Sequence, residues 1–323
     1  MIVYLFKRLL SIIPILIGIT FLTYLVIVLS PGGPVSFMND FNPKISQEYK
    51  QKMVEIYGLN KPIHQQYFNW VKKVIRLDFG ETRKDNQPVI KKIKERLPKT
   101  VLLSGFSMLI AFFLAIPIGV FSAMHKDSLW DKALTVFVFI GFSIPTYWVA
   151  LLLMIGVGIH LGWLPLVGFR SLFYENLSPF GKMIDIARHL ALPLFVTSIT
   201  SLAGLSRYIR NGMLEVSKQD YIRTARSKGL SEARVIWGHG FRNTLLQLIT
   251  IVGLSIPELL SAGVIFETIF SYPGLGRLAF EAVMTRDMPL IMATVTIGAI
   301  ATLLGNLAAD IAYAYADPRI RAQ

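Results

Sequence analysis

The sequence predicts an all-α integral membrane protein with six transmembrane helices, and three observations lead to this fold class. Of the 323 residues, 53% are hydrophobic and only 16% are charged, whereas soluble domains have about 25% charged residues. The apolar residues are gathered in runs of about 20, the length that a helix needs to cross a bilayer. Runs of this length exclude transmembrane strands, since only helices and closed barrels span lipid.

Six apolar stretches are expected to be the spans. They are, in chain order, Leu9–Leu29, Val101–Met124, Ala133–Ile159, Leu190–Ser206, Leu245–Phe266 and Leu290–Ala309. The first is too long for the apolar part of a signal peptide, and Ser30-Pro-Gly-Gly-Pro34 follows it instead of a small-residue cleavage site. We therefore interpret residues 1–30 as an uncleaved first transmembrane helix.

Pro117, Pro145, Pro193 and Pro257 each lie inside one of these stretches. A proline removes one helical hydrogen bond and kinks the axis. Such kinks would permit the hinge motions of a transporter, although membrane helices also tolerate proline without any such role.

The long segment 31–100 is expected to form an extracytoplasmic helical part. Pro62 suits a first helical turn, and the apolar residues after it recur at helical spacing. These residues are Ile63, Tyr67, Trp70, Val71 and Val74. An earlier helix is expected between Ser46 and Gly58. The segment either caps the bundle beside a translocation path or serves as a spacer. The remaining residues, 101–323, are expected to form a five-helix core with a cytoplasmic loop at 207–244.

Loop cations set the expected orientation. The loop between the fourth and fifth spans carries eight cations against three acids, so it should be cytoplasmic. With six spans, both termini are then cytoplasmic as well. The five cations between Lys91 and Lys99 do not fit this orientation, because it places them on the outer side, just before the second span. The rule weakens in loops longer than about 60 residues, so we keep the assignment.

Composition also excludes several classes of site. The chain has no cysteine and five scattered histidines, so neither disulfides nor a histidine–cysteine metal site is expected. The net charge of +13 is better explained by anionic lipid and inside loops than by nucleic acid. The chain also lacks a P-loop, a His-Glu-x-x-His motif and a nucleophile–base–acid set. Energy for uphill transport would have to come from a partner or an ion gradient.

The basic segment from Asp220 to Arg242 is predicted to contain a sharp helical corner. Residues up to Lys228 have helix-compatible composition, and Lys228 complements the negative end of the helix dipole. Gly229 fits the left-handed position after the helix, with Leu230 as its apolar neighbour. Ser231 is a suitable N-cap for a second helix. A corner of this shape can dock in a groove on a partner, although it is also compatible with an ordinary inside loop.

The fifth stretch contains an acid, Glu258, after Pro257, and Glu267 closes it. An acid near the middle of the bilayer costs about 3 kcal/mol, so it usually faces a cavity or a partner. All three residues are candidates for a translocation pathway or a contact between permeases. For Glu258 the alternative is a hydrogen bond at the Pro257 kink. For Glu267, capping or a salt bridge at the outer boundary is favoured.

Motifs along the whole chain resemble the peptide/nickel branch of ABC importer permeases, and in particular its first permease subunit. The stretches that carry the resemblance are Arg8–Pro14, Ser30–Pro34, Tyr57–Pro62, Leu77–Gly80, Glu95–Pro98, Ser143–Trp148, Leu161–Pro165, Glu267–Gly276, Asp310–Tyr313 and Asp317–Arg321. The spacing Ala225-x-x-x-Gly229 resembles the family's coupling loop. Arg223-Thr-Ala225 stands where the general importer loop has Glu-Ala-Ala, which leaves open which residues grip the ATPase.

The resemblance implies a type I ABC importer permease fold in a bacterial or archaeal inner membrane. It implies a second, homologous permease subunit, two cytoplasmic ATPase subunits and an extracytoplasmic solute-binding protein. ATP and magnesium would be bound by the ATPases, and this chain would need no cofactor. The residues expected to couple to the ATPase are Arg223, Ala225, Gly229, Leu230 and Ser231.

Di- and oligopeptides are the expected substrates. Nickel chelates, glutathione or oligosaccharides remain open, because selectivity in such systems rests largely with the binding protein. An ion-coupled transporter or a channel would need intramembrane ionisable residues, and only Glu258 qualifies.

Overall fold

The structure, a computed structural model, describes residues 2–30, 60–244, 248, 251 and 263–316. These residues form helices joined by loops, with one isolated antiparallel bridge between Glu81 and Pro88. The α-helices are α1 (Ile2–Leu29), α4 (Ile63–Val74), α5 (Val89–Met124), α6 (Leu129–Ser143), α7 (Thr146–Leu153), α8 (Pro179–Val216), α9 (Asp220–Ser227), α12 (Gly263–Ile269), α13 (Leu275–Met284) and α14 (Met288–Ala316). Two π-helical segments, Met154–His160 and Arg234–Phe241, and a 3₁₀ turn, Tyr174–Asn176, complete the described helical elements.

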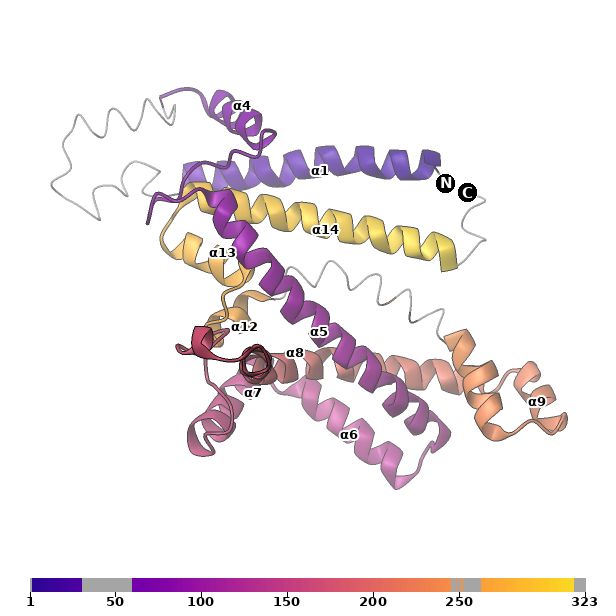
Figure 1. Cartoon of the computed structure of the whole chain (residues 1–323). Helices are drawn as coiled ribbons and strands as arrows, with labels where there is room; N and C mark the ends of the chain where they lie inside the picture. The colour runs from indigo at the N-terminus through magenta and orange to yellow at the C-terminus, as the bar shows by residue number, and fades with distance from the viewer. Residues whose placement is uncertain (1, 31–59, 245–247, 249–250, 252–262, 317–323) are drawn as a thin grey trace.

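Two groups of long helices make up the bundle (Figure 1). Helix α1 lies along α14, and α5 lies along α8, with α6 and α7 also packed on α8. The short helix α13 joins the groups, since it contacts both α5 and α14. An ion pair fixes one end of the first group, where Arg8 Nη2 lies 2.7 Å from Asp310 Oδ2.

Helices α5 and α8 approach closely because a glycine faces the contact. A β-carbon at Gly119 would lie 2.7 Å from both the β-carbon of Ile209 and the carbonyl oxygen of Ser206. The buried Ala115, Val120 and Met213 continue this core. Small residues are typical of such contacts, since helix association in lipid depends on close packing.

Within the part of the chain that the structure describes, four helices are long and apolar enough to cross a membrane: Arg8–Leu29, Val89–Met124, Pro179–Val216 and Met288–Ile311. They include four of the six predicted spans. The predicted span Ala133–Ile159 is wrong as a continuous helix. Helix α6 ends at Ser143, Ile144 is extended, and α7 begins after Pro145. Proline disfavours a helical conformation in the residue before it, so the helix breaks here instead of kinking. Most of the predicted span Leu245–Phe266 lies outside the described residues.

Two of the long helices extend well beyond the predicted spans. Helix α5 begins at Val89 and α8 at Pro179. Their polar first turns lie outside the apolar runs, so hydropathy did not include them. Lys92, one of the five cations that do not fit the expected orientation, lies 2.7 Å from the carboxylate of Asp85. This contact pairs one of the five cations with an acid.

Helix α4 packs on the end of α1. The Tyr67 hydroxyl lies 2.8 Å from the Thr20 hydroxyl, and the Tyr24 hydroxyl donates to Gln66 at 3.0 Å. The predicted apolar face is partly buried here, since Ile63, Trp70 and Val71 pack against the cluster of the buried Tyr24 and Tyr67. Pro62 precedes the helix, as expected. The helix expected from Ser46 to Gly58 lies outside the described residues.

Different elements lie at the two ends of the bundle. The start of α1, the end of α14 and the basic α9 lie together at one end, and α4 lies at the other (Figure 1). The helices therefore place the basic loop and both described chain ends on one side of the bundle.

Candidate coupling loop and its supporting contacts

The predicted corner is present at the end of α9. The Gly229 amide donates to the Arg226 carbonyl at 2.9 Å, and the Leu230 amide donates to the Ala225 carbonyl at 3.4 Å. This pair of bonds defines a Schellman motif, with glycine at its left-handed position. Gly229 has a φ of 74°, which L-residues adopt only with strain. The chain therefore reverses at Gly229 because the left-handed backbone conformation of this residue ends α9.

One side of the corner is a small apolar core. Ile222, Ala225 and Val235 are buried, with Val216 and Leu230 packed against them. Ile222 and Ala225 are three residues apart on α9, so they lie on one helical face. Ala225 is only 6% exposed, which leaves little room for a larger side chain. The core fixes α9 against the segment that follows it.

The other side of the corner is polar and exposed. Arg223, Ser231 and Gly229 all face solvent. Arg226 spans the corner to Glu232, with Nη2 at 2.7 Å from Oε1. The hydrogen bond from Arg226 lowers the pKa of Glu232 below its usual range. The ion pair holds the two arms of the corner together across Gly229.

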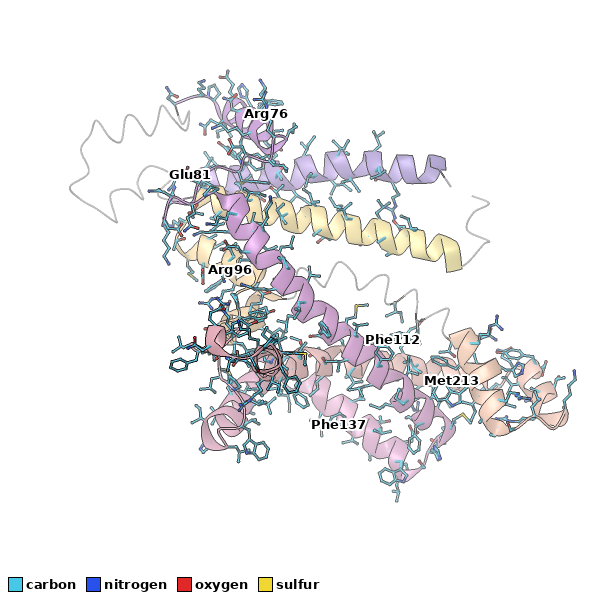
Figure 2. All side chains as sticks on the ribbon, in the orientation of Figure 1. Arg76, Glu81, Arg96, Phe112, Phe137 and Met213 are labelled. Carbon is cyan, nitrogen blue, oxygen red and sulfur yellow. The ribbon has the colours of Figure 1, made fainter. Side chains whose placement is uncertain are left out.

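A second helical segment follows, as predicted, but its first amides bond to the backbone carbonyl of Ser231 and not to the side-chain hydroxyl that an N-cap would use. The carbonyl of Ser231 accepts hydrogen bonds from the amides of Arg234 and Val235, at 2.9 and 3.0 Å. The segment is π-helical from Arg234 to Phe241, which sequence reasoning did not predict. Met213 of α8, labelled in Figure 2, packs against Ile236 and Phe241 of this segment.

A buried ion pair binds α8 to the start of α6, just before the loop. Arg210 donates two hydrogen bonds to Asp131, from Nε at 2.8 Å and from Nη2 at 2.7 Å. The Ser122 hydroxyl and the Asp127 amide also donate to Asp131, which is 3% exposed. The Arg210 guanidinium, helped by Ser122, holds the pKa of the Asp131 carboxyl well below its usual range. One carboxylate thus joins α5, α6 and α8.

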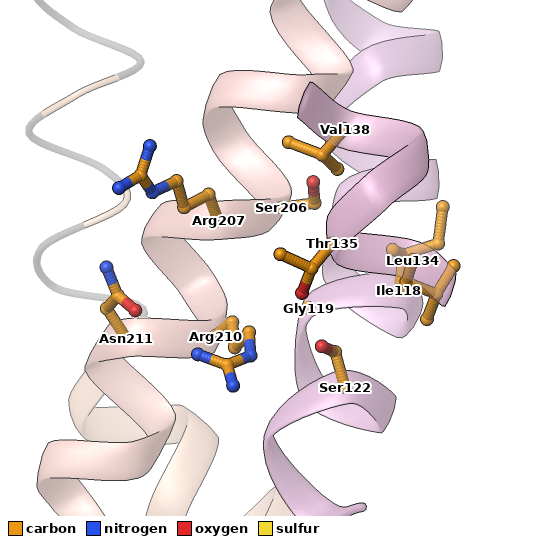
Figure 3. Close-up of a pocket in the computed structure, with 10 residues that line it drawn as sticks. All are labelled: Ile118, Gly119, Ser122, Leu134, Thr135, Val138, Ser206, Arg207, Arg210 and Asn211. Atoms are coloured by element: carbon orange, nitrogen blue, oxygen red, sulfur yellow. The ribbon is translucent and has the colours of Figure 1, made fainter. Parts of the chain in front are cut away.

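A pocket of about 190 Å³ lies beside this ion pair (Figure 3). Arg210 points from α8 towards Ser122 of α5, and Arg207 and Asn211 of α8 also line the pocket. The pocket is lined by both polar and apolar side chains of α5, α6 and α8.

Glu267 occupies a capping position. It is fully buried. Its Oε1 accepts from the Thr100 hydroxyl at 2.6 Å, and its Oε2 accepts from the Arg277 amide at 2.9 Å. The Leu275 amide donates to Thr100 Oγ1 at 2.7 Å. A carboxylate at a helix N-terminus satisfies amides that have no partner within the helix, so Glu267 and Thr100 cap α13. Gly274 admits the carboxylate, because a β-carbon there would lie 2.1 Å from Oε1.

Of the predicted site residues, the structure brings together the five of the loop: Arg223, Ala225, Gly229, Leu230 and Ser231. It places Glu267 elsewhere, in the capping network. Pro257 and Glu258 lie outside the described residues.

Sequence reasoning missed the Asp131–Arg210 pair and the Arg226–Glu232 pair. One local signal was available, since the Ser128 hydroxyl accepts from the Asp131 amide and Ser-x-x-Asp is a typical helix start. The arginine partner lies far along the chain and has no local signature.

These features define an integral membrane protein with a helical permease architecture. The chain belongs to a family described as the inner membrane component of binding-protein-dependent transport systems, whose model matches residues 115–322. The model of that family's N-terminal region matches residues 1–104. It is therefore a multi-pass inner membrane protein.

The chain is similar over its whole length to three curated relatives. It is 44% identical to an oligopeptide transport system permease protein of Bacillus subtilis, with 98% of both chains covered. It is 35% identical to a di/tripeptide transport system permease protein of Pseudomonas aeruginosa, with full coverage of both. It is also 35% identical to a dipeptide transport system permease protein of Escherichia coli, with 99% of both covered.

A solved structure shares the fold. The similarity to a chain of the MetNI methionine ABC transporter has a TM-score of 0.57 at 13% identity, and covers 72% of this chain and 99% of that one. At this identity the likeness concerns the fold alone. It agrees with the expected type I permease fold.

Proposed function

We propose that this chain is a membrane-spanning subunit of an ATP-driven importer that takes up di- and oligopeptides. The observation that carries the proposal is its full-length similarity, at 35–44% identity, to permeases named for oligopeptide, di/tripeptide and dipeptide transport. The exposed corner at Gly229 adds a structural argument, since it provides a rigid shape for docking to a separate motor.

The partners in this proposal are a second, homologous permease, two cytoplasmic ATPases and an extracytoplasmic solute-binding protein. The ATPases bind ATP and magnesium, and this chain hydrolyses nothing and needs no cofactor. The family description, which names dependence on a binding protein, supports the last of these partners.

Coupling in this scheme runs through the corner. The exposed face of α9, with Arg223, Gly229 and Ser231, contacts an ATPase, and the apolar core around Ala225 passes its movement to the next segment. Met213 and the Asp131–Arg210 pair then connect that movement to α5, α6 and α8. Pro257 and Glu258 remain candidates for the pathway. The loop and both termini face the cytoplasm, and residues 31–100 lie outside.

The test is purification of the tagged chain from native membranes, followed by reconstitution with the subunits that accompany it. We expect ATPases and a second permease to co-purify, and we expect ATP-dependent uptake of a labelled tripeptide when the binding protein is added. A homo-oligomer without ATPases would refute the importer assignment. Uptake of nickel chelates, glutathione or an oligosaccharide but not of peptides would refute the substrate class alone.

A further inference from the structure

A second pocket, of about 320 Å³, lies at the end of the molecule opposite α9. Its lining comes from three separate places: Lys99 near the start of α5, the loop Gly168–Tyr174 before α8, and Ser271 with Pro273 in the turn between α12 and α13. None of these residues is used by the coupling loop. In the proposed topology this pocket opens outside the cell, so the inference below rests on the proposed function.

The walls of this outer pocket are held by contacts among its three parts and with α8. The Gly168 amide donates to the Phe270 carbonyl at 2.8 Å, and the Ser171 amide donates to Asp185 Oδ2 at 2.9 Å. The Tyr272 hydroxyl donates to the Lys99 carbonyl at 2.8 Å. A preorganised site of this kind loses less entropy when a partner binds.

Positive charge predominates around the outer pocket. Lys99 Nζ lies 5.5 Å from the centre of the Phe169 ring, and the Arg170 guanidinium lies 5.1 Å from that of Tyr174. Lys182 also lies over Tyr174, and its ammonium and Arg170 share one carboxylate, that of Glu175. Three cations are thus present with one acid, which leaves a net positive charge at the pocket. The site therefore suits a carboxylate ligand.

Two large apolar side chains stand beside these cations. Leu172 is 99% exposed and Phe173 is 72% exposed, and both lie between Arg170 and Tyr174 in the pocket-lining loop. Exposed apolar residues next to charged ones are typical of protein contact surfaces. A peptide held inside the pocket would leave Leu172 and Phe173 uncovered, whereas a protein surface would cover them.

We propose that the outer pocket, together with Leu172 and Phe173, is a docking site for an acidic loop of the extracytoplasmic solute-binding protein. A carboxylate of that loop enters between Lys99 and Arg170, and apolar residues beside it cover Leu172 and Phe173. Contacts of this kind set the rate of association and the register of a transient complex.

The test uses the intact complex in lipid nanodiscs without ATP and measures the affinity of the purified binding protein. We expect Lys99→Gln/Arg170→Gln to weaken binding by about tenfold or more, since close charge pairs at interfaces contribute at least about 1.5 kcal/mol. We expect Leu172→Ser/Phe173→Ser to weaken it as well. Lys72→Gln/Lys73→Gln is the matched control, because it removes two exposed cations of the outer helix α4, and it should leave affinity within about twofold.

A zero-length carbodiimide cross-linker identifies the partner directly, since it joins Lys99 only to a carboxylate in contact with it. A cross-link from Lys99 to an aspartate or glutamate of the binding protein supports the proposal. Equal affinity of the wild type and both pocket variants, or a cross-link only to the second permease, overturns it. Weaker binding only after Leu172→Ser/Phe173→Ser, together with loss of nanodisc lipid contacts, would assign the loop to the membrane. If the wild-type complex does not bind the binding protein, the proposed function is wrong, whatever the pocket variants show.

Discussion

Gly229 makes the shape of the loop depend on one backbone angle. A β-carbon at this position would meet open space, yet φ is 74°, so a substitution strains the backbone without a steric clash. We expect Gly229→Ala to cost about 1 kcal/mol locally and Gly229→Asp to uncouple transport while the complex still assembles. The measurement is ATP-dependent uptake together with ATPase activity stimulated by the binding protein. Gly238→Ala is the control, because its β-carbon would meet only Arg234, at 3.8 Å. Full uptake by Gly229→Asp would refute the docking role of the corner.

Asp131 makes the stability of the folded protein depend on pH. Its folded pKa is lowered by Arg210, so the pair stabilises the protein fully above the unfolded pKa of about 3.9. That stabilisation is lost as the pH falls through the lower, folded value. Asp131→Asn should cost about 3 kcal/mol, because it leaves Arg210 without its charged partner. Thermal unfolding in detergent should show a lowered Tm for Asp131→Asn at pH 7 and a difference from the wild type that shrinks at the lowest accessible pH. An unchanged Tm at pH 7 would contradict the role of the pair.

Thr100 links α5, α12 and α13 through one hydroxyl. Replacement by valine keeps the shape but leaves Glu267 short of one donor and the Leu275 amide without an acceptor. We expect Thr100→Val to lower the free energy of unfolding by about 1–3 kcal/mol. Thr23→Val on α1 is the control, because that exposed hydroxyl donates only to its own helix, at Ile19. Similar melting temperatures for the two variants would show that the cap is dispensable.

At the scale of elements, the contact between α5 and α8 depends on Gly119. Addition of one methyl group there would force Ile209 and Ser206 away, and overpacking of this kind costs about 1–3 kcal/mol. Gly119→Ala should therefore lower the Tm of the purified complex. Gly105→Ala lies on the same helix with nothing within 4 Å, and it should be neutral or slightly stabilising. The reverse order would mean that the two helices separate easily.

Local chemistry was sufficient to predict some of these elements. The Gly229 corner follows from a helix-ending pattern that lies within a few residues, and the face of α4 follows from its periodicity. Hydropathy could not distinguish a kinked helix from a broken one at Pro145, because both remain apolar. It also missed the polar first turns of α5 and α8, which extend beyond the apolar runs.

Contacts between distant residues could not be predicted in this way. Asp131 meets Arg210 from 79 residues away, and Thr100 meets Glu267 from 167 residues away. From the sequence alone, each of these residues could face solvent, cap a helix or line a pathway. Only the folded arrangement decides between them, as it does for Glu267.

For the whole molecule, the topology can be tested with single cysteines, since the chain contains none of its own. We expect Ser231→Cys to react with an impermeant maleimide only from the cytoplasmic side, and Asn69→Cys on α4 to react only from outside. Both positions are exposed on this chain, so in membranes that contain it without the ATPases, access to the reagent depends on the side of the membrane alone. Labelling of Ser231→Cys from outside would invert the proposed orientation.

The length of α8 has a mechanical consequence. Its 38 residues correspond to about 57 Å of helix, nearly twice the thickness of the hydrocarbon layer, about 30 Å. Its first turn lies beside the outer pocket, and its last turn leads into the corner at Gly229. A lever of this length that pivots at one end by about 5° would move its far end by about 5 Å. In the proposed importer, a small rotation of α8 at its cytoplasmic end would therefore move its first turn by several ångströms, and Pro193, inside the helix, is where the axis would bend.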